Sequence, residues 1–111
     1  MNNKVQKHFC NKYIYIAIHD DIIKSLIIAK ESYIKNNLKD KYHYTEKAID
    51  LIFKFKESAT EINIDSKELY RNLYLDLNIF LIKGDINKIN SVIIQLKELK
   101  KLILEMEYKN L

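Results

Sequence analysis

The stretch KDKYHYTEKAIDLIFKFKESATE, from Lys39 to Glu61, changes from polar and aromatic to apolar at helical spacing. In its second half, apolar residues recur every three or four positions, as they do along one face of a helix. They are Ala48, Ile52, Phe55, Ala59 and Ile62, with Ile49 and Phe53 widening the stripe. Thr45 can cap this helix, because its hydroxyl can accept a hydrogen bond from a backbone N–H of the first turn. The stretch therefore predicts an amphipathic helix over about residues 46–62.

An earlier segment, from about Lys12 to Asn36, has the same spacing. Its inner positions are Ile16, Ile23, Ile27 and Ile34, flanked by Tyr15, Ile22, Leu26 and Tyr33. The stretch NNLKDKYHY (residues 36–44) carries paired asparagines and charges, and it interrupts the pattern. The sequence predicts one long amphipathic helix here, followed by a link to an antiparallel neighbour.

Two further helices are expected after the opening stretch. Asp65 can cap a third helix that begins at Ser66, and Gly84 can end it, because glycine enters the left-handed conformation without steric cost. Asp85 can cap a fourth helix that fades near Glu107. Their inner positions are Leu69, Leu73, Leu77, Phe80 and Leu81 in the third helix, and Ile86, Ile89, Ile93, Leu96, Leu99 and Ile103 in the fourth.

The composition supports a helical chain. Proline is absent and there is one glycine, whereas sheets usually take their turns from these two residues. A length of 111 residues suits one domain with a single modest core. Four apolar stripes with short links can be buried only against one another. We predict an all-α fold, an antiparallel up-down four-helix bundle over residues 12–111, preceded by a flexible tail over residues 1–11.

Cysteine content and hydropathy indicate where the protein resides. Cys10 is the one cysteine, so an internal disulfide is impossible and a reducing compartment is favoured. The longest apolar run near the start, YIYIAI at residues 13–18, is far shorter than the roughly 20 residues that span a bilayer. We expect a cytoplasmic location and no membrane association.

The charge leaves two interpretations open. A net charge of +4 and a pI near 9.0 favour an anionic partner such as a nucleic acid. All but one of the 19 basic residues are lysines, however, and Arg71 is the single arginine. Arginine is the preferred residue for bidentate phosphate contacts, and an AT-rich genome also produces a chain rich in lysine, isoleucine and asparagine. The lysines therefore form either an anion-binding face or an ordinary solvated surface.

No pattern of catalytic or metal-binding residues stands out. His8 with Cys10, His19 with the two aspartates that follow it, and His43 all lack the repeated spacing of zinc or carboxylate-bridged sites. Each histidine is expected on the surface or at a helix end. There is no glycine-rich loop for a nucleotide and no arginine–histidine pair like that of helical ribonucleases. We expect no enzyme activity, no metal and no cofactor.

Aromatic and basic residues are mixed just before the second helix. Such a mixture can stack bases and pair with phosphates. The candidate nucleic-acid-binding residues are Lys35, Lys39, Lys41, Tyr42, Tyr44, Lys47 and Arg71. Tyrosines near a helix start also often cover the end of a core, so Tyr42 and Tyr44 have a packing interpretation as well. Tyr70 and Tyr74, four residues apart, share a helix face where a second subunit can pack.

Two of these stretches resemble a known family. KYHYT (Lys41–Thr45) looks like the basic residue, Tyr-x-x-Thr opening of the second helix in four-helix-bundle proteins encoded in intervening sequences of bacterial ribosomal RNA genes. SKELYRNLYLDL (Ser66–Leu77) resembles their third-helix pattern. The same superfamily includes the accessory variability determinants of diversity-generating retroelements. Lys41, Tyr42, Thr45 and Arg71 occupy motif positions.

The resemblance implies a basic, oligomeric and non-catalytic bundle that binds RNA or a reverse-transcriptase-type nucleoprotein. From it we expect an accessory protein that forms a homo-oligomer. The site would be the lysine-rich face around the first link and Arg71.

A second resemblance leads to another class of partner. DDIIKSLIIAK (Asp20–Lys30) and ELYRNLYLDLNIFLI (Glu68–Ile82) are similar to segments of the flagellin export chaperone, another small helical bundle. That similarity implies a chaperone or adaptor that offers an apolar groove to a helix of a partner protein.

Overall fold

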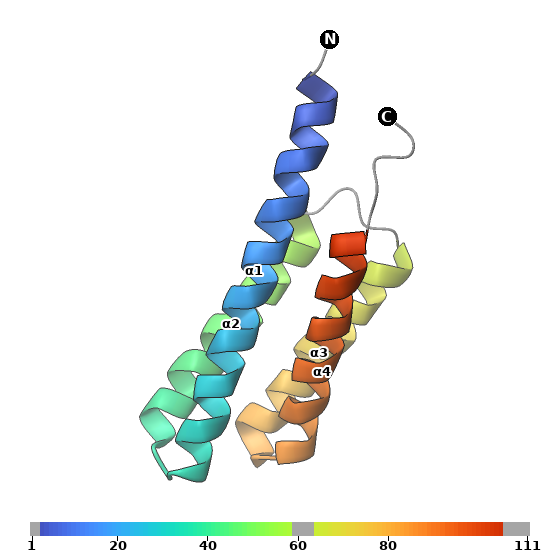
Figure 1. The fold of residues 1–111 in the computed structure, drawn as a ribbon. Coiled ribbons are helices and arrows are strands. Elements are labelled where there is room, and N and C mark those ends of the chain that lie inside the picture. Colours follow the sequence, from blue (N-terminus) through green and yellow to red (C-terminus); the bar gives the residue numbers. More distant parts are fainter. Residues whose placement is uncertain (1–2, 59–63, 106–111) are drawn as a thin grey trace.

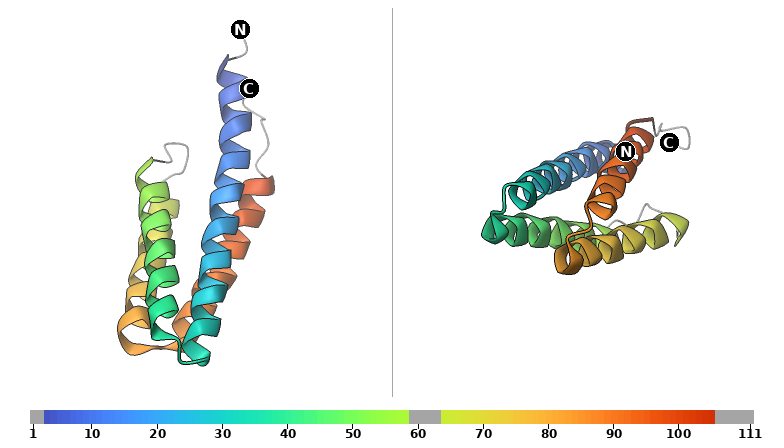
Figure 2. Two further views of the ribbon diagram at one scale, coloured as in Figure 1. Left: turned by 90° about the vertical axis from the view of Figure 1, so that its left-hand side faces the viewer. Right: turned by 90° about the horizontal axis from the view of Figure 1, so that it is seen from below.

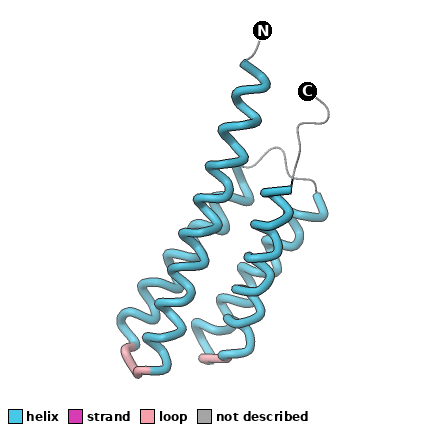
Figure 3. Tube along the Cα trace, in the orientation of Figure 1, coloured by secondary structure: helices cyan, strands magenta, loops and turns pink. Residues whose placement is uncertain are grey.

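The computed structural model describes residues 3–58 and 64–105 of the chain. They form four α-helices in the order α1 (Asn3–Ile34), α2 (Leu38–Ser58), α3 (Ile64–Lys83) and α4 (Ile86–Glu105), shown in Figure 1. Within these described ranges there is no strand, and the two short loops lie at the same end of the molecule (Figure 3). The prediction of an all-α chain is confirmed.

Successive helices run in opposite directions and enclose one core. α1 packs against α2 and α4, and α3 packs against the same two helices (Figure 2). The prediction of an up-down four-helix bundle is therefore confirmed. Because α1 borders α4 and α2 borders α3, the α1–α4 face and the α2–α3 face lie on opposite sides of the bundle.

α1 is much longer than its neighbours. It has 32 residues, whereas α2 has 21 and α3 and α4 have 20 each. At 1.5 Å per residue, α1 is about 48 Å long and the others about 30 Å. Its N-terminal part projects beyond the rest of the bundle (Figure 1). The helix begins at Asn3 and not at Lys12, so the segment expected to be a tail has helical backbone. No apolar stripe precedes Lys12, so the sequence contains no pattern from which this first part of α1 could be predicted.

The start of α2 also differs from the prediction. The helix begins at Leu38, and Asn37 caps it: the Asn37 Oδ1 accepts the Asp40 backbone N–H at 3.2 Å. The Asn37 Nδ2 donates to the Asp40 carboxylate at 3.0 Å, which completes a reciprocal cap. Asn36 has φ 63°, a left-handed conformation that asparagine tolerates. Thr45 therefore lies inside α2 and is not its cap, so that prediction is wrong.

The core contains most of the expected positions. Ile52 and Phe55 of the opening stretch are 0% and 2% exposed. The buried apolar side chains are Ile22, Ile23, Leu26, Ala29, Ala48, Ile52, Phe55, Tyr70, Leu73, Leu77, Phe80, Ile89, Val92, Ile93, Leu96, Leu99 and Ile103. Three residues expected inside are exposed instead: Ile27 by 39%, Ile34 by 65% and Phe53 by 47%. Ala59 and Ile62 lie outside the described residues.

The turn between α3 and α4 follows the prediction at Gly84 and Asp85. Gly84 has φ 68°, and its N–H donates to the Phe80 carbonyl at 2.7 Å. The Asp85 carboxylate accepts the Asn87 backbone N–H at 3.0 Å and caps α4. Both predicted ends are confirmed. α3 itself begins at Ile64, so Asp65 lies within its first turn and does not precede the helix.

Replacing Gly84 by alanine should destabilise the protein strongly. A non-glycine residue in this conformation costs about 1–2 kcal/mol, and here the new Cβ would also overlap the hydroxyl of Tyr33. We expect the free energy of unfolding, measured in urea, to fall by about 2–3 kcal/mol.

Asn36→Ala is the matched control, since it places alanine in the same conformation at a site that already accommodates a Cβ. Its loss should be about 1 kcal/mol. Equal losses in the two variants would show that the contact between Gly84 and Tyr33 is unimportant.

Candidate functional site

Lys41, a predicted RNA contact, lies inside the bundle. The residue is 4% exposed, and its Nζ donates to the carbonyl oxygen of Leu81 at 3.0 Å. Three aromatic rings surround the ammonium: the centroids of Tyr33, Tyr42 and Phe80 lie 4.9, 5.1 and 5.2 Å from it. Lys41 is therefore not on the exposed lysine-rich face that was expected around the first link.

The hydrogen bond from Lys41 joins α2 to the C-terminal end of α3. The Leu81 carbonyl is one of the last four of α3, which have no partner within the helix. A cation at a helix C-terminus is also favoured by the helix dipole. Burial lowers the pKa of the Lys41 ammonium, whereas the carbonyl and the three rings favour its charged form. Lys41 thus acts as a structural link from α2 to the end of α3.

Thr45, one turn further along α2, is also inside. It is 0% exposed, and its Oγ1 has no hydrogen-bond partner among the described residues. Lys41, Thr45, Ala48 and Ile52 follow at steps of four, three and four residues, so the inner stripe of α2 begins with two polar residues. This is why the sequence pattern placed the helix start too late.

Replacing Thr45 by valine should stabilise the protein. Valine keeps the branched shape and removes a buried hydroxyl that has no partner, and such a group costs about 1–3 kcal/mol. We expect the free energy of unfolding to rise by about 1 kcal/mol. Thr45→Ser is the control: it keeps the hydroxyl, loses a methyl and should destabilise. A loss of stability in the valine variant would mean that the hydroxyl has a partner in solution.

The other predicted contacts near the first link are mostly accessible. Lys35, Lys39 and Lys47 are exposed, and no ion pair occupies them in the described part of the chain. Tyr42 is 45% exposed, whereas Tyr44 is half-buried and packs against the core. Three of the predicted lysines and Tyr42 are therefore at the surface.

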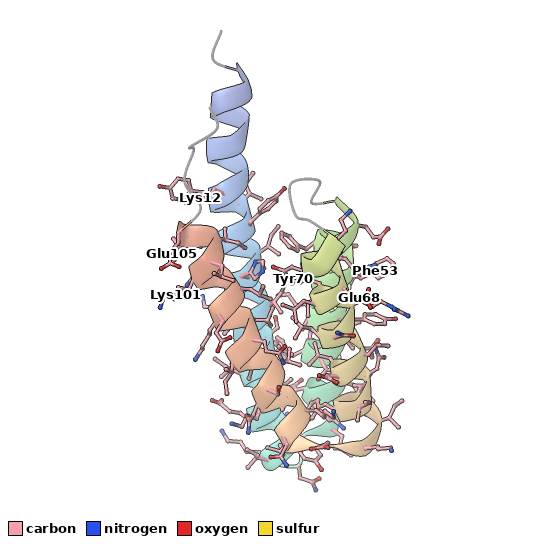
Figure 4. The ribbon with its side chains drawn as sticks, turned by 90° about the vertical axis from the view of Figure 1, so that its right-hand side faces the viewer. Lys12, Phe53, Glu68, Tyr70, Lys101 and Glu105 are labelled. Atoms are coloured by element: carbon pink, nitrogen blue, oxygen red, sulfur yellow. The ribbon has the colours of Figure 1, made fainter. Side chains whose placement is uncertain are left out.

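Arg71 lies apart from these residues. It is exposed near the N-terminal end of α3, and its guanidinium is 3.4 Å from the carboxylate of Glu68. Glu68 and Phe53 lie on the side of the bundle opposite Lys101 and Glu105 (Figure 4). The predicted site thus divides into exposed residues at and after the first link and a separate arginine.

His19, expected at the surface, is fully buried. Its Nδ1 donates to the Tyr15 carbonyl at 2.7 Å, and its Nε2 lies 2.7 Å from the Tyr70 hydroxyl. Because a carbonyl only accepts, the neutral ring carries its proton on Nδ1 and the Tyr70 hydroxyl donates to Nε2. Tyr70 points into the bundle (Figure 4), so it is not available to a second subunit.

The surroundings of this pair favour the neutral forms of both groups. Phe55 contacts His19 edge to face with ring centroids 4.9 Å apart. Desolvation by burial lowers the pKa of His19 and raises the pKa of Tyr70. The hydrogen bond between His19 and Tyr70 therefore joins α1 to α3 inside the core.

Two features are absent from the described part of the chain: a metal-binding cluster and a membrane-spanning helix. No three histidine, cysteine, aspartate or glutamate side chains are grouped so that they could hold a metal ion. None of the four helices, over the residues searched, combines the length and hydropathy needed to traverse a bilayer.

A groove with a volume of about 520 Å³ lies between α1 and α4. Four isoleucines line it, and we call it the isoleucine groove: Ile27 and Ile34 from α1, and Ile93 and Ile94 from α4. Ile34 is 65% and Ile94 57% exposed. Large aliphatic side chains gathered at a surface commonly mark an interaction site.

Charged side chains border the isoleucine groove. Lys30 and Glu31 lie on the α1 wall, and Lys97 lies on the α4 wall beside the amide of Asn90. Neither Lys30 nor Lys97 forms an ion pair with another described residue. Beyond the groove, Asp20 and Lys100 join α1 to α4 with a 2.6 Å ion pair.

A second groove, of about 360 Å³, lies on the opposite side of the bundle between α2 and α3. Its apolar lining is partly aromatic, and the rings of Phe53 and Tyr74 are 6.1 Å apart. Glu46 and Asp50 lie at its edge, and Asp50 is paired with Lys54 at 2.9 Å. This groove is smaller than the isoleucine groove and carries no lysine in its lining.

The sequence did not reveal either groove. Ile27, Ile34 and Phe53 fit the inner stripes by spacing, and the apolar arcs of α1 and α2 are wider than the core can cover. The one available signal was this excess width. Together, fold and site define a helical bundle with an open aliphatic groove and with no metal-binding cluster among its described residues. Comparison with protein-family models, curated proteins and solved structures finds no match.

Proposed function

We propose that the protein is a non-enzymatic binding module that holds an amphipathic helix of a partner protein in the isoleucine groove. The observation that carries this proposal is the exposure of Ile27, Ile34 and Ile94 around one groove. Burying exposed apolar surface contributes roughly 25 cal/mol for each Å². A partner that covers these side chains gains most of its affinity from them.

The shape of the groove favours a helix as the ligand. Its lining spans residues 27–34 of α1 and 90–97 of α4, which is two turns of each helix. A third helix can lie along the depression between two packed helices and present apolar residues at positions i, i+3 or i+4, and i+7. The ligand is then recognised as an amphipathic helical segment.

RNA or a nucleoprotein remains a second candidate, supported by the exposure of Lys35, Lys39, Lys47 and Tyr42. Binding there would be electrostatic and would release counterions. We rank it second because Lys41 is engaged inside the bundle and Arg71 lies elsewhere. The isoleucine groove also offers no aromatic ring on which a base can stack.

Self-association, the homo-oligomer expected from the resemblance, is a competing candidate in which a second copy covers the isoleucine groove. The two grooves lie on opposite faces, so the α2–α3 face of one copy can meet the α1–α4 face of another, and such head-to-tail contacts build rings or filaments. Sedimentation equilibrium tests this directly. A mass that stays at 13.3 kDa at high concentration would remove the homo-oligomer from the account.

The test of the binding proposal uses a designed 18-residue helical peptide with a leucine stripe and a glutamine polar face. Fluorescence anisotropy should show binding to the protein and a loss of at least tenfold in affinity for Ile94→Asp. Ile82→Asp is the matched control, because Ile82 is 78% exposed and lies outside both grooves.

An RNA oligonucleotide is titrated in parallel. Three phosphate contacts should lower RNA affinity roughly twentyfold or more between 50 and 200 mM salt, whereas peptide affinity should change little. If the RNA binds, the peptide does not, and Ile94→Asp has no effect, the second candidate replaces the first.

A further inference from the structure

We infer that the partner helix is acidic: it carries glutamate or aspartate along both edges of its apolar stripe, opposite Lys30 and Lys97. This inference rests on the proposed function of the isoleucine groove and adds the chemical class of its partner. The partner is another polypeptide, not a second copy of the chain.

The first argument is the position of the two lysines. Lys30 lies on the α1 wall and Lys97 on the α4 wall, so a helix in the groove has one cation on each side. Glu31 is the one carboxylate among the lining residues. The lining therefore has a net positive charge, and it attracts a segment whose flanks are negative.

The second argument is that neither lysine is paired within the bundle. Lys54, Lys88 and Lys100 form ion pairs with aspartates at 2.9, 3.5 and 2.6 Å. Lys30 and Lys97 form none with any described residue, although Glu31 is adjacent to Lys30 in the chain. Their charges remain available to a ligand.

The same charge continues along the face. Lys24 precedes Ile27 by three residues and Lys101 follows Lys97 by four, so both lie one turn beyond the groove on the same helix faces. Both are exposed, and neither forms an ion pair with a described residue. An acidic helix longer than the groove would meet this second pair of lysines.

The floor of the groove decides between a polypeptide and a nucleic acid. Four isoleucines give an aliphatic surface that matches leucine, isoleucine or valine side chains, whereas bases bind best to aromatic rings. A second copy that met the groove through its α2–α3 face would bring two carboxylates, Glu46 and Asp50, and Asp50 is already paired with Lys54. A helix with carboxylates along both edges of its apolar stripe therefore matches Lys30 and Lys97 better.

The experiment compares three peptides with the same leucine stripe and with glutamate, glutamine or lysine on the polar face. Their affinities are measured at 50 mM salt for the natural protein, for Lys30→Glu/Lys97→Glu and for Ile94→Asp. Exposed charge pairs have modest strength, so the preference is expected to be roughly tenfold for the glutamate over the lysine peptide. The double charge reversal should invert this order, and Lys47→Glu, far from the groove, should leave it unchanged.

Each outcome has a separate meaning. If all three peptides bind equally and the charge reversal has no effect, the acidic partner is wrong and the helix-binding groove survives. If no peptide binds, or if binding is unaffected by Ile94→Asp, the proposed function fails together with the inference. If the protein sediments as an oligomer that Ile94→Asp dissociates, a second copy covers the groove and the inference is overturned.

Discussion

Replacing Lys41 by alanine is expected to lower the free energy of unfolding by about 2–3 kcal/mol. The variant loses a charge-assisted hydrogen bond to Leu81 and the contacts of the ammonium with three rings. It also leaves an orphan carbonyl at the end of α3. Urea unfolding followed by circular dichroism gives the value directly.

Lys47→Ala is the matched control, because Lys47 is an exposed lysine six residues away on the same helix. Its effect should stay within about 0.5 kcal/mol. The pair of variants also separates structure from binding: if Lys41→Ala keeps full stability but loses affinity for RNA, the buried position of Lys41 is contradicted and its role as a nucleic-acid contact is restored.

Acidification is expected to destabilise the protein through His19. Desolvation by burial lowers the pKa of His19 in the folded state; its hydrogen bond to the Tyr15 carbonyl and the charge of Asp20 oppose this shift, and Lys100 adds to it. In the unfolded chain the ring titrates near 6.5, so below that pH the unfolded state binds more protons. Stability is therefore complete above about pH 6.5 and falls as the pH decreases toward the folded pKa.

The expected slope is up to about 1.4 kcal/mol for each pH unit, the value for one proton. It should be measured by urea unfolding between about pH 5 and 6.5, above the range in which carboxylates titrate. His19→Gln removes the titrating group and should flatten this slope. An unchanged slope in this variant would show that His19 is not desolvated.

The second half of α2 shows how much of the fold could be predicted. Ala48, Ile52 and Phe55 recur at helical spacing, and all three are buried. Spacing alone was sufficient to predict these buried positions because they are all apolar. The end of α3 at Gly84 and the start of α4 at Asp85 could be predicted for a different reason. Few residue types adopt a left-handed φ readily, and few have a side chain that accepts a hydrogen bond from an unpaired backbone N–H.

The first turns of α2 could not be predicted, because their inner positions are polar. Lys41 occupies a core position since a carbonyl at the end of α3 and aromatic rings from α1, α2 and α3 surround it. These partners are up to 40 residues distant in the chain. No local pattern contains them, so a lysine within a polar stretch looked like part of a link.

The burial of His19 could not be predicted for the same reason: one of its partners is distant in the chain. Its two partners are Tyr15, one turn away, and Tyr70, 51 residues away in the chain. A histidine between polar and apolar neighbours fits either side of a helix, and only the position of Tyr70 decides between them. The candidate groove was hidden for the opposite reason: its isoleucines fit the inner stripe by spacing, and only the packed bundle shows which ones remain uncovered.

The most direct test of the isoleucine groove is a methyl NMR titration of the protein with the glutamate peptide, with the isoleucine δ1 methyl groups labelled. The account predicts that the signals of Ile27, Ile34, Ile93 and Ile94 shift together, while those of the buried Ile22, Ile52 and Ile89 stay in place. Shifts confined to Ile49, on the α2–α3 face, or the absence of any shift at saturating peptide, would contradict it.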